Sequence, residues 1–250
     1  MRPKTLVLRS AGTNCDGEAV FAFEQAGSDV ELIHVNRLVE NPVLLDRFQI
    51  MAVPGGFSYG DDIAAGKILA NQIAHHLRPA FLKFVEAGKP IIGICNGFQV
   101  LVKTDMLPGP LGGRSGQTCT LTNNTSGRFT DRWIKLAPRP SHCIWTAGIG
   151  PMELPIAHGE GRFVPADDAV RAALWEKRQV PLVYEGENPN GSTDAIAGVC
   201  DASGLVFGLM PHPERHIDPT QHPAWTSRNP LPVEGDGLRV FRNAVRHVAG

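Results

Sequence analysis

Apolar residues recur along the first hundred positions in two spacings, and the alternation predicts strands separated by helices. Short apolar, β-branched runs are typical of strands buried on both faces. They cover residues 5–9, 30–35, 48–53 and 90–94. Residues 18–26 and 66–87 instead place apolar residues three or four apart, which predicts two amphipathic helices, the second long and continuous. This order favours an α/β fold with a doubly wound, mostly parallel sheet and helices on both of its faces.

The pattern changes after residue 116, where shorter strand-like runs predict a small antiparallel elaboration of the sheet. The expected strands cover residues 117–122, 133–137, 154–157, 180–184, 195–199 and 205–210. A helix is expected near residues 166–177, and the apolar spacing over residues 237–248 predicts a closing helix. Because no internal repeat or low-complexity linker interrupts the chain, we expect residues 1–250 to form a single domain.

Residues 89–101 carry the strongest candidate for chemistry. A buried strand ends, Cys95 follows at once, and a helix begins. A side chain at such a junction lies on a sharp turn, as in the nucleophile elbow of hydrolases, and Gly93 and Gly97 leave room for that turn. Because the N-terminus of a helix stabilises negative charge, it favours the thiolate of Cys95 over the thiol. We predict that Cys95 is a nucleophile, although an isolated cysteine is more commonly a buried structural residue.

A nucleophilic cysteine needs a base and a group that orients the base. His212 follows the apolar run at residues 205–210, so it lies at the carboxyl end of a predicted strand, on the same sheet edge as Cys95. Prolines on both sides stiffen its backbone. Glu214, two residues further on, can reach the imidazole and fix its tautomer, as an aspartate does in serine triads. We predict that His212 is the base and that Glu214 orients it.

Acyl transfer also needs N–H groups that stabilise an oxyanion. The amide of Asn96, directly after the nucleophile, is one candidate. The other is Gly56, because a glycine pair after a strand permits backbone angles that aim an N–H outward, although a tight turn would need the same glycines. Residues 56–60 also match the G-x-S-x-G elbow of serine hydrolases. Ser58, however, lies beyond the end of its strand and before the next helix begins, which disfavours it as a nucleophile.

The composition of the chain limits the classes of partner and ligand that we expect it to bind. The formal net charge is −1 and no long basic stretch occurs, so we expect no nucleic acid partner. The first residues lead directly into a strand and no apolar run is long enough to cross a membrane, so we expect a cytoplasmic protein. The five cysteines are odd in number and form no C-x-x-C, which favours reduced thiols. Histidines and cysteines are too scattered for a metal site, and no phosphate-binding G-x-x-x-x-G-K-[ST] is present.

Two motifs together identify a family. Gly-Ile-Cys-Asn-Gly-Phe-Gln at residues 93–99, followed more than a hundred residues later by Pro-His-Pro-Glu at 211–214, resembles the class I (triad) glutamine amidotransferases, which have a flavodoxin-like sheet. Further segments extend the resemblance from the first strand to the last helix. They are residues 12–16, 55–61, 156–161 and 188–192. Within the family, the whole set is similar to glutaminase subunits that serve an ATP-dependent synthetase of purine biosynthesis.

The resemblance implies that Cys95 attacks the side-chain amide of glutamine, that His212 moves protons and that Glu214 orients His212. It also makes Gly55, Gln99 and His158 candidate contacts to glutamine. Ammonia would pass to a separate synthetase subunit that binds ATP and magnesium, and a small third subunit could bridge the two. This chain itself would hold no cofactor and no metal.

The sequence departs from the family pattern at residues 10–11, at residues 62–64 and in a longer segment at residues 216–233, which puts the partner contacts in doubt. Three alternatives stay open. The chain could be a cysteine peptidase or small-molecule hydrolase on the same fold, a serine hydrolase that uses Ser58, or a non-catalytic relative that serves as a binding module.

Overall fold

A computed structural model describes residues 2–114 and 116–250. The strands are β1 Lys4–Arg9, β2 Asp29–His34, β3 Ile50–Val53, β4 Ile91–Ile94, β5 Cys119–Thr122, β6 Thr130–Pro138, β7 Met152–His158, β8 Arg162–Pro165, β9 Leu182–Tyr184, β10 Ile196–Cys200 and β11 Val206–Leu209. The helices are α1 Asp16–Ala26, α2 Val35–Glu40, α3 Lys67–Gln72, α4 Arg78–Glu86, α5 Asn96–Lys103, α6 Asp168–Glu176 and α7 Leu238–Ala249. The predicted strands are present within a few residues of the expected bounds, whereas α2 and β8 were not foreseen.

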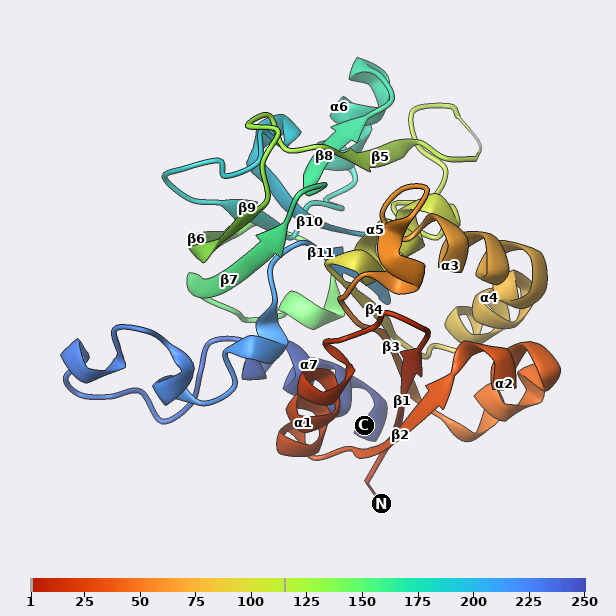
Figure 1. Ribbon diagram of the computed structural model, residues 1–250, viewed down its shortest axis with the longest axis horizontal. Coiled ribbons are helices and arrows are strands. Elements are labelled where there is room, and N and C mark those ends of the chain that lie inside the picture. The colour runs from red at the N-terminus through yellow and green to blue at the C-terminus, as the bar shows by residue number, and fades with distance from the viewer. Residues whose placement is uncertain (1, 115) are drawn as a thin grey trace.

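One nine-stranded sheet organises the molecule, in the order β2-β1-β3-β4-β11-β10-β9-β6-β7 (Figure 1). Its first five strands pair in parallel. Helical segments connect β1, β2, β3 and β4, whereas β11 follows the antiparallel strand β10. The α/β prediction with a doubly wound sheet is therefore confirmed. The parallel strands end at one common edge, so the residues after β1, β3, β4 and β11 lie near one another.

The antiparallel elaboration is continuous with the parallel part. Strand β10 pairs antiparallel with β11 through the tight turn at residues 201–204, and β9, β6 and β7 extend the same sheet. Strands β5 and β8 form a separate antiparallel pair. The loop after β7 lies at the edge of the sheet where the parallel strands end, since its residues line the same pocket as Cys95.

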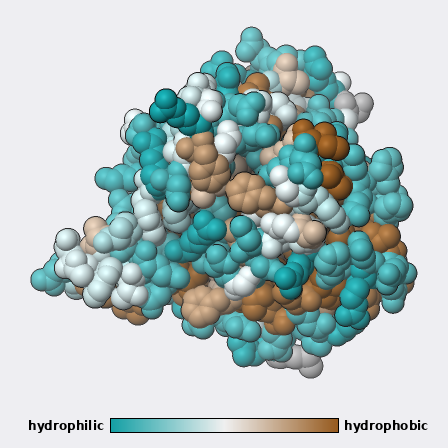
Figure 2. All heavy atoms as spheres, in the orientation of Figure 1, coloured by the Kyte–Doolittle hydropathy of each residue, from teal (hydrophilic) through white to brown (hydrophobic). Residues whose placement is uncertain are grey.

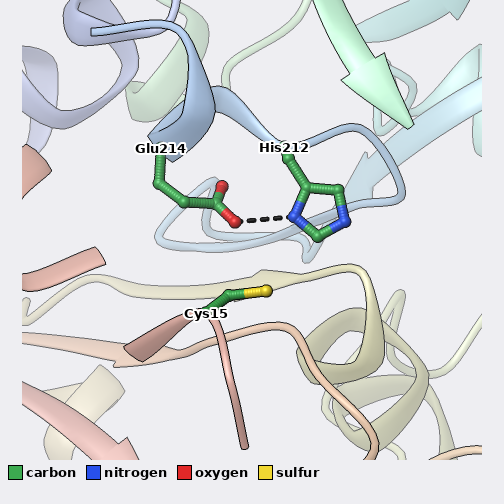
Figure 3. A group of neighbouring side chains, drawn as sticks. All are labelled: Cys15, His212 and Glu214. Atoms are coloured by element: carbon green, nitrogen blue, oxygen red, sulfur yellow. Dashed lines mark hydrogen bonds and ion pairs between the residues drawn. The ribbon is translucent and has the colours of Figure 1, made fainter. Parts of the chain in front are cut away.

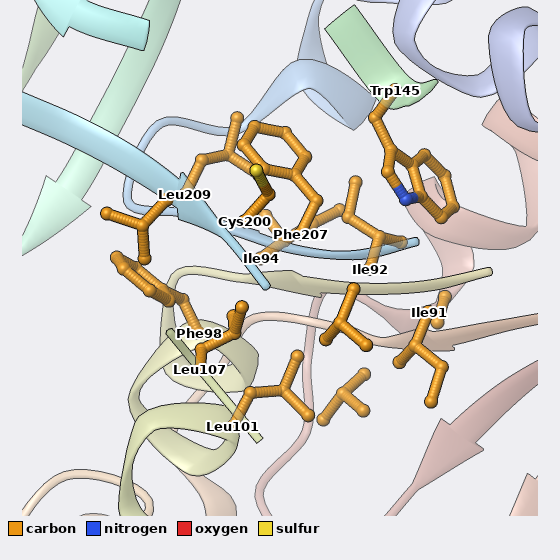
Figure 4. Packing of buried hydrophobic residues seen from close by; sticks show 14 of the residues in the cluster. Ile91, Ile92, Ile94, Phe98, Leu101, Leu107, Trp145, Cys200, Phe207 and Leu209 are labelled. Carbon is orange, nitrogen blue, oxygen red and sulfur yellow. The ribbon is translucent and has the colours of Figure 1, made fainter. Parts of the chain in front are cut away.

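Helices cover both faces of the parallel strands. On one face α1 and α7 pack together, with the rings of Phe23 and Phe241 4.9 Å apart. On the other face, α5 lies against β4 and β11. Figure 4 shows Phe98 and Leu101 of α5 on one side of these two strands and Trp145 on the other. Because β4 is covered on both faces, all four of its residues are buried, as its apolar run predicted.

The helix expected over residues 66–87 is not continuous. Helix α3 ends at Gln72, a π-helical turn covers Ile73–Leu77, and α4 begins at Arg78. Pro79 explains the interruption, because proline has no N–H to donate and its ring clashes with the carbonyl of the preceding turn. Proline is tolerated only in the first turn of a helix, where α4 has it.

The segment between β11 and α7 projects from the body of the molecule (Figure 1). Its base is held by Glu153 of β7, whose carbonyl oxygen accepts a hydrogen bond from Nδ1 of His216 at 2.7 Å and whose carboxylate lies 3.1 Å from Nε2 of His222. Polar side chains cover most of the face shown in Figure 2, with apolar groups scattered among them. Among the described residues, no helix has the length and apolar character needed to span a membrane.

Candidate active site

Cys95 lies on a strained turn at the end of β4. Its φ is +51°, a left-handed conformation that a non-glycine residue seldom adopts, while its N–H donates to the carbonyl of Leu209 and its carbonyl accepts from Gln99. Strain of this kind persists only where the surrounding structure holds it, and it gathers at functional sites. The side chain is 6% exposed, and its Sγ lies 3.7 Å from the carbonyl oxygen of Ala157. The turn therefore presents one sulfur at the carboxyl edge of the sheet.

The close approach of α5 to β3 requires glycine at position 97. A Cβ there would lie 1.8 Å from the carbonyl oxygen of Val53, far inside van der Waals contact. We expect Gly97→Ala to destabilise the fold by about 1–3 kcal/mol or more, because the backbone atoms involved cannot yield. Urea unfolding measures the change. Gly17→Ala is the control, because no atom lies within 4 Å of a Cβ at this α1 position; equal stability of the two variants would contradict the expectation.

His212 and Glu214 form a buried pair at the same edge. The N–H of His212 donates to the carbonyl of Pro155 at 2.9 Å, which fixes the backbone after β11. Glu214 lies in the 3-10 turn Pro213–Arg215, and its Oε1 is 2.6 Å from Nδ1 of His212 (Figure 3). Each residue is 1% exposed. Nε2 of His212 makes no hydrogen bond within the described part of the chain, so this nitrogen is available to exchange a proton.

The charges around His212 favour its protonated form. Burial lowers the pKa of this imidazole, but the negative charge of Glu214 and the sulfur of Cys95 outweigh burial and raise the pKa well above its ordinary value. An imidazolium beside Cys95 stabilises the thiolate in turn. The pair is therefore suited to hold a nucleophilic sulfur and to supply a proton to a leaving group.

Gly55 packs against both Cys95 and the imidazole of His212. A Cβ on this residue would lie 2.9 Å from Cε1 of His212 and 3.4 Å from Cβ of Cys95, so both side chains flank the same glycine. Any larger residue would displace the imidazole. Gly55 thus makes room for the predicted triad, and a contact between Gly55 and a substrate stays a prediction.

Two backbone N–H groups beside the sulfur have no acceptor in the described residues. Asn96 is the first residue of α5, so its N–H has no partner within the helix. Gly56 adopts a φ of +139°, and its neighbour Phe57 forms the hydrogen bond to the loop after β1 instead. Both residues adjoin the position of Cys95, as an oxyanion hole requires.

A pocket opens over Cys95 and Gly56. Gln99, Asp61 and Glu160 line it, and the stacked aromatic rings of Phe57 and Phe129 stand at its side with about half of each side chain exposed. The pocket contains carboxylates and an amide beside the thiol of Cys95, which suits a small polar substrate.

Two of the predicted substrate contacts line this pocket, and both are already engaged. Nε2 of Gln99 donates to the carbonyl of Glu160 at 2.6 Å, and Oε1 of Gln99 accepts from Asn96. His158 is 3% exposed and its Nδ1 lies 3.2 Å from Oδ1 of Asn124. Burial, and then the charge of His212, lower the pKa of His158 to about 4, so this ring stays neutral. Their contact with glutamine stays a prediction.

Ser58 has a structural partner instead of a catalytic base. It is 2% exposed, lies in the 3-10 turn Ser58–Asp61, and its hydroxyl donates to Oδ1 of Asn96 at 2.5 Å. The side-chain amide of Asn96 also donates to Asp61, so Asn96 ties the start of α5 to the loop after β3. Within residues 2–114 and 116–250 no histidine forms a hydrogen bond with Ser58, and the serine hydrolase alternative loses its support.

Cys15 lies closer to the site than its sequence context indicated. Cys15 is buried at the start of α1. Its Sγ, a ring nitrogen of His212 and a carboxylate oxygen of Glu214 all lie within 4.8 Å of one another. The only signal in the sequence was that Cys15, like Cys95, follows a parallel strand.

Comparison with known proteins agrees with this geometry. Residues 2–248 match the family of CobB/CobQ-like glutamine amidotransferase domains. The PurQ subunit of phosphoribosylformylglycinamidine synthase from Dehalococcoides mccartyi is 49% identical over 97% of this chain and 96% of its own length. The PurQ subunit from Treponema denticola is 43% identical over 87% of this chain and 89% of its own length.

Solved structures agree as well. A chain of the PurLQS structure from Thermotoga maritima superposes with a TM-score of 0.77 at 33% identity, covering 99% of this chain and all of that one. A glutamine amidotransferase from the same organism, only 13% identical, shares the fold with a TM-score of 0.57. The chain therefore belongs to the CobB/CobQ-like glutamine amidotransferases and, within them, to the PurQ subunits of phosphoribosylformylglycinamidine synthase.

Proposed function

We propose that this chain hydrolyses glutamine to glutamate and ammonia and passes the ammonia to a synthetase subunit. The synthetase would use it with ATP to convert phosphoribosylformylglycinamide to phosphoribosylformylglycinamidine in purine biosynthesis. Full-length similarity to PurQ subunits supports this assignment. The observation that carries the chemistry is the set of Cys95, His212 and Glu214 at one sheet edge, beside two free N–H groups.

In the first half of the reaction, the thiolate of Cys95 attacks the side-chain amide carbon of glutamine. The oxyanion that forms accepts hydrogen bonds from the N–H groups of Gly56 and Asn96. His212 then donates the proton on its Nε2 to the amide nitrogen, which leaves as ammonia, and Cys95 is left as a γ-glutamyl thioester. Glu214 holds Nδ1 of the imidazole throughout and stabilises its positive charge.

In the second half, water attacks the thioester carbon while His212 takes one proton from the water. The carbon–sulfur bond breaks, glutamate leaves, and Cys95 returns to the thiolate. Gly55 keeps the space between sulfur and imidazole open, and we propose that Gln99 and His158 hold the glutamine in the pocket. No cofactor takes part in these steps.

The energy-requiring step belongs to a partner in this proposal. By analogy with the Thermotoga maritima PurLQS assembly, the chain would dock with a PurL synthetase subunit and a small PurS subunit. ATP and magnesium would bind the synthetase, and residues 1–250 would act as one cytoplasmic domain. Ammonia is lost to water unless the subunits are docked, so we expect weak glutaminase activity from the isolated chain. High turnover without the partner would count against this division of labour.

Labelling with a glutamine analogue that carries an electrophilic diazoketone tests the assignment. We expect the analogue to alkylate Cys95 in the complex, because this sulfur is the one that faces the pocket. Peptide mapping by mass spectrometry locates the adduct, and excess glutamine should suppress it. The other four cysteines are the internal control. An adduct only on Cys15, Cys119, Cys143 or Cys200, or none at all, would refute the proposal.

A further inference from the structure

A second sulfur lies beneath the predicted triad without a role in the chemistry described so far. Cys15 is 1% exposed and its Sγ lies within 4.8 Å of both a ring nitrogen of His212 and a carboxylate oxygen of Glu214. In Figure 3 the sulfur lies on the side of the imidazole and carboxylate that faces the segment after β1. Nearly two hundred residues separate Cys15 from the pair in sequence, so the contact is a product of the tertiary fold.

Arg215 joins Cys15 to the turn that carries Glu214. Its Nη2 donates to Sγ of Cys15 at 3.1 Å, and its Nε lies 3.8 Å from Oε1 of Glu18 in α1. The thiol of Cys15 itself donates to Oδ1 of Asn14 at 3.4 Å. The guanidinium therefore bridges the 3-10 turn Pro213–Arg215 and the N-terminus of α1, and the sulfur is the acceptor between them.

Cys15 also holds the loop that packs against both Cys95 and the imidazole of His212. Its N–H donates to the carbonyl of Gly55 at 3.2 Å, and a Cβ on Gly55 would lie 3.2 Å from its Sγ. The segments after β1, β3 and β11 thus meet at this one side chain. Movement of the Cys15 sulfur would alter the space in which His212 sits.

The charged and titratable groups around His212 also indicate that Cys15 influences this imidazole. The groups that face it are Glu214 from its own turn, Cys95 from the elbow, Cys15 from the loop after β1 and His158 from β7. Burial lowers the pKa of His212, whereas Glu214 and the neighbouring sulfurs of Cys95 and Cys15 raise it. Burial likewise lowers the pKa of the Arg215 guanidinium, but the sulfur of Cys15 and the carboxylates of Glu214 and Glu18 raise that pKa overall.

A metal ion is not the natural occupant of this cluster, although Cys15, His212 and Glu214 are close enough to share one. The guanidinium of Arg215 already donates to the sulfur, so positive charge is present where a cation would have to bind. Oε1 of Glu214 is also occupied by the imidazole. We infer that these contacts position the imidazole of His212 instead of binding a metal ion.

We propose that Cys15 and Arg215 form a latch that positions the imidazole of His212 for glutamine hydrolysis. The inference rests on the function proposed above, and Cys15 acts as a positioning residue that does not touch the substrate. Loss of the latch lets the turn of Glu214 move away from α1. A displacement of the base by about 1 Å lowers turnover by up to about 10²-fold without weakening substrate binding.

The test compares glutamine-dependent rates of the whole complex for Cys15→Ala, Cys15→Ser and Arg215→Gln across pH. We expect Cys15→Ala and Arg215→Gln each to lower kcat by roughly 10- to 100-fold with little change in KM, because only the position of the base changes. The basic limb of kcat/KM should move to lower pH in Cys15→Ala, because the imidazole loses a neighbouring sulfur that raises its pKa. Cys15→Ser, which retains an acceptor for Arg215, should restore most of the activity.

Cys119→Ala is the matched control, since it also deletes a buried sulfur, but from β5 and away from the pocket. Ammonia-dependent synthesis by each complex reports whether the subunits still assemble. The latch is refuted if Cys15→Ala and Arg215→Gln keep the wild-type kcat and pH profile, or if they lose activity only to the extent that Cys119→Ala does. If Cys15→Ala does not fold, the kcat and pH profile of Arg215→Gln alone decide whether the proposal stands. Failure of the wild-type complex to hydrolyse glutamine would instead refute the proposed function.

Discussion

Replacement of Cys95 by alanine is expected to abolish glutamine-dependent synthesis and to leave ammonia-dependent synthesis intact. The alanine removes the nucleophile, so no thioester forms, and glutamine hydrolysis should fall by roughly 10⁴-fold or more. The methyl group fits the strained turn at φ +51° no worse than the cysteine does, so the fold should persist. A coupled assay of the complex, supplied first with glutamine and then with ammonium salt, measures both activities.

Cys143→Ala is the control, because it deletes another buried sulfur that does not line the pocket. It should retain both activities. Substantial glutamine hydrolysis by Cys95→Ala would remove Cys95 from the mechanism. Equal loss of both activities would mean that the substitution disturbs the assembly and not the chemistry of this chain.

Replacement of Glu214 by glutamine is expected to have the second largest effect. The carboxylate holds Nδ1 of His212 at 2.6 Å and raises the pKa of the imidazole. Without its charge that pKa falls, so less of the enzyme carries the imidazolium near neutral pH. We expect kcat for glutamine to drop by roughly 10²- to 10⁴-fold, because the base also loses its fixed tautomer.

The pH profile distinguishes the loss of the Glu214 charge from a loss of folded protein. In the intact enzyme the basic limb of kcat/KM reports deprotonation of His212, and in Glu214→Gln that limb should move to lower pH. Glu176→Gln, at an exposed position of α6, should leave the rate and the profile unchanged. A Glu214→Gln variant with a wild-type rate and an unshifted basic limb would show that Glu214 does not orient the base.

Local signals in the sequence were sufficient to predict the parallel strands and three residues of the candidate site. A β-branched run stands out wherever a strand is covered on both faces, as β4 is. Cys95 was recognisable because a strand, a single side chain and a helix start follow one another without a gap. His212 and Glu214 were recognisable because prolines enclose the histidine and the carboxylate is two residues away.

Apolar spacing alone was misleading over residues 66–87, where its regularity predicted one continuous helix. The interruption at Ile73–Leu77 comes just before Pro79, whose missing N–H is a local signal that the apolar spacing does not register. The folded chain also brings the buried amide of Asn96 to Ser58, which resembled a nucleophile in isolation.

The sequence by itself determined the alternation of strands and helices, the sharp turn at Cys95 and the family, because these depend on neighbouring residues. Only the tertiary structure decided that Cys15 and Arg215 meet beneath the imidazole and that Gly55 packs against both Cys95 and His212. Those contacts arise where strands distant in sequence end at one edge of a parallel sheet. Their geometry follows from strand order and register, which the pattern of single residues does not encode.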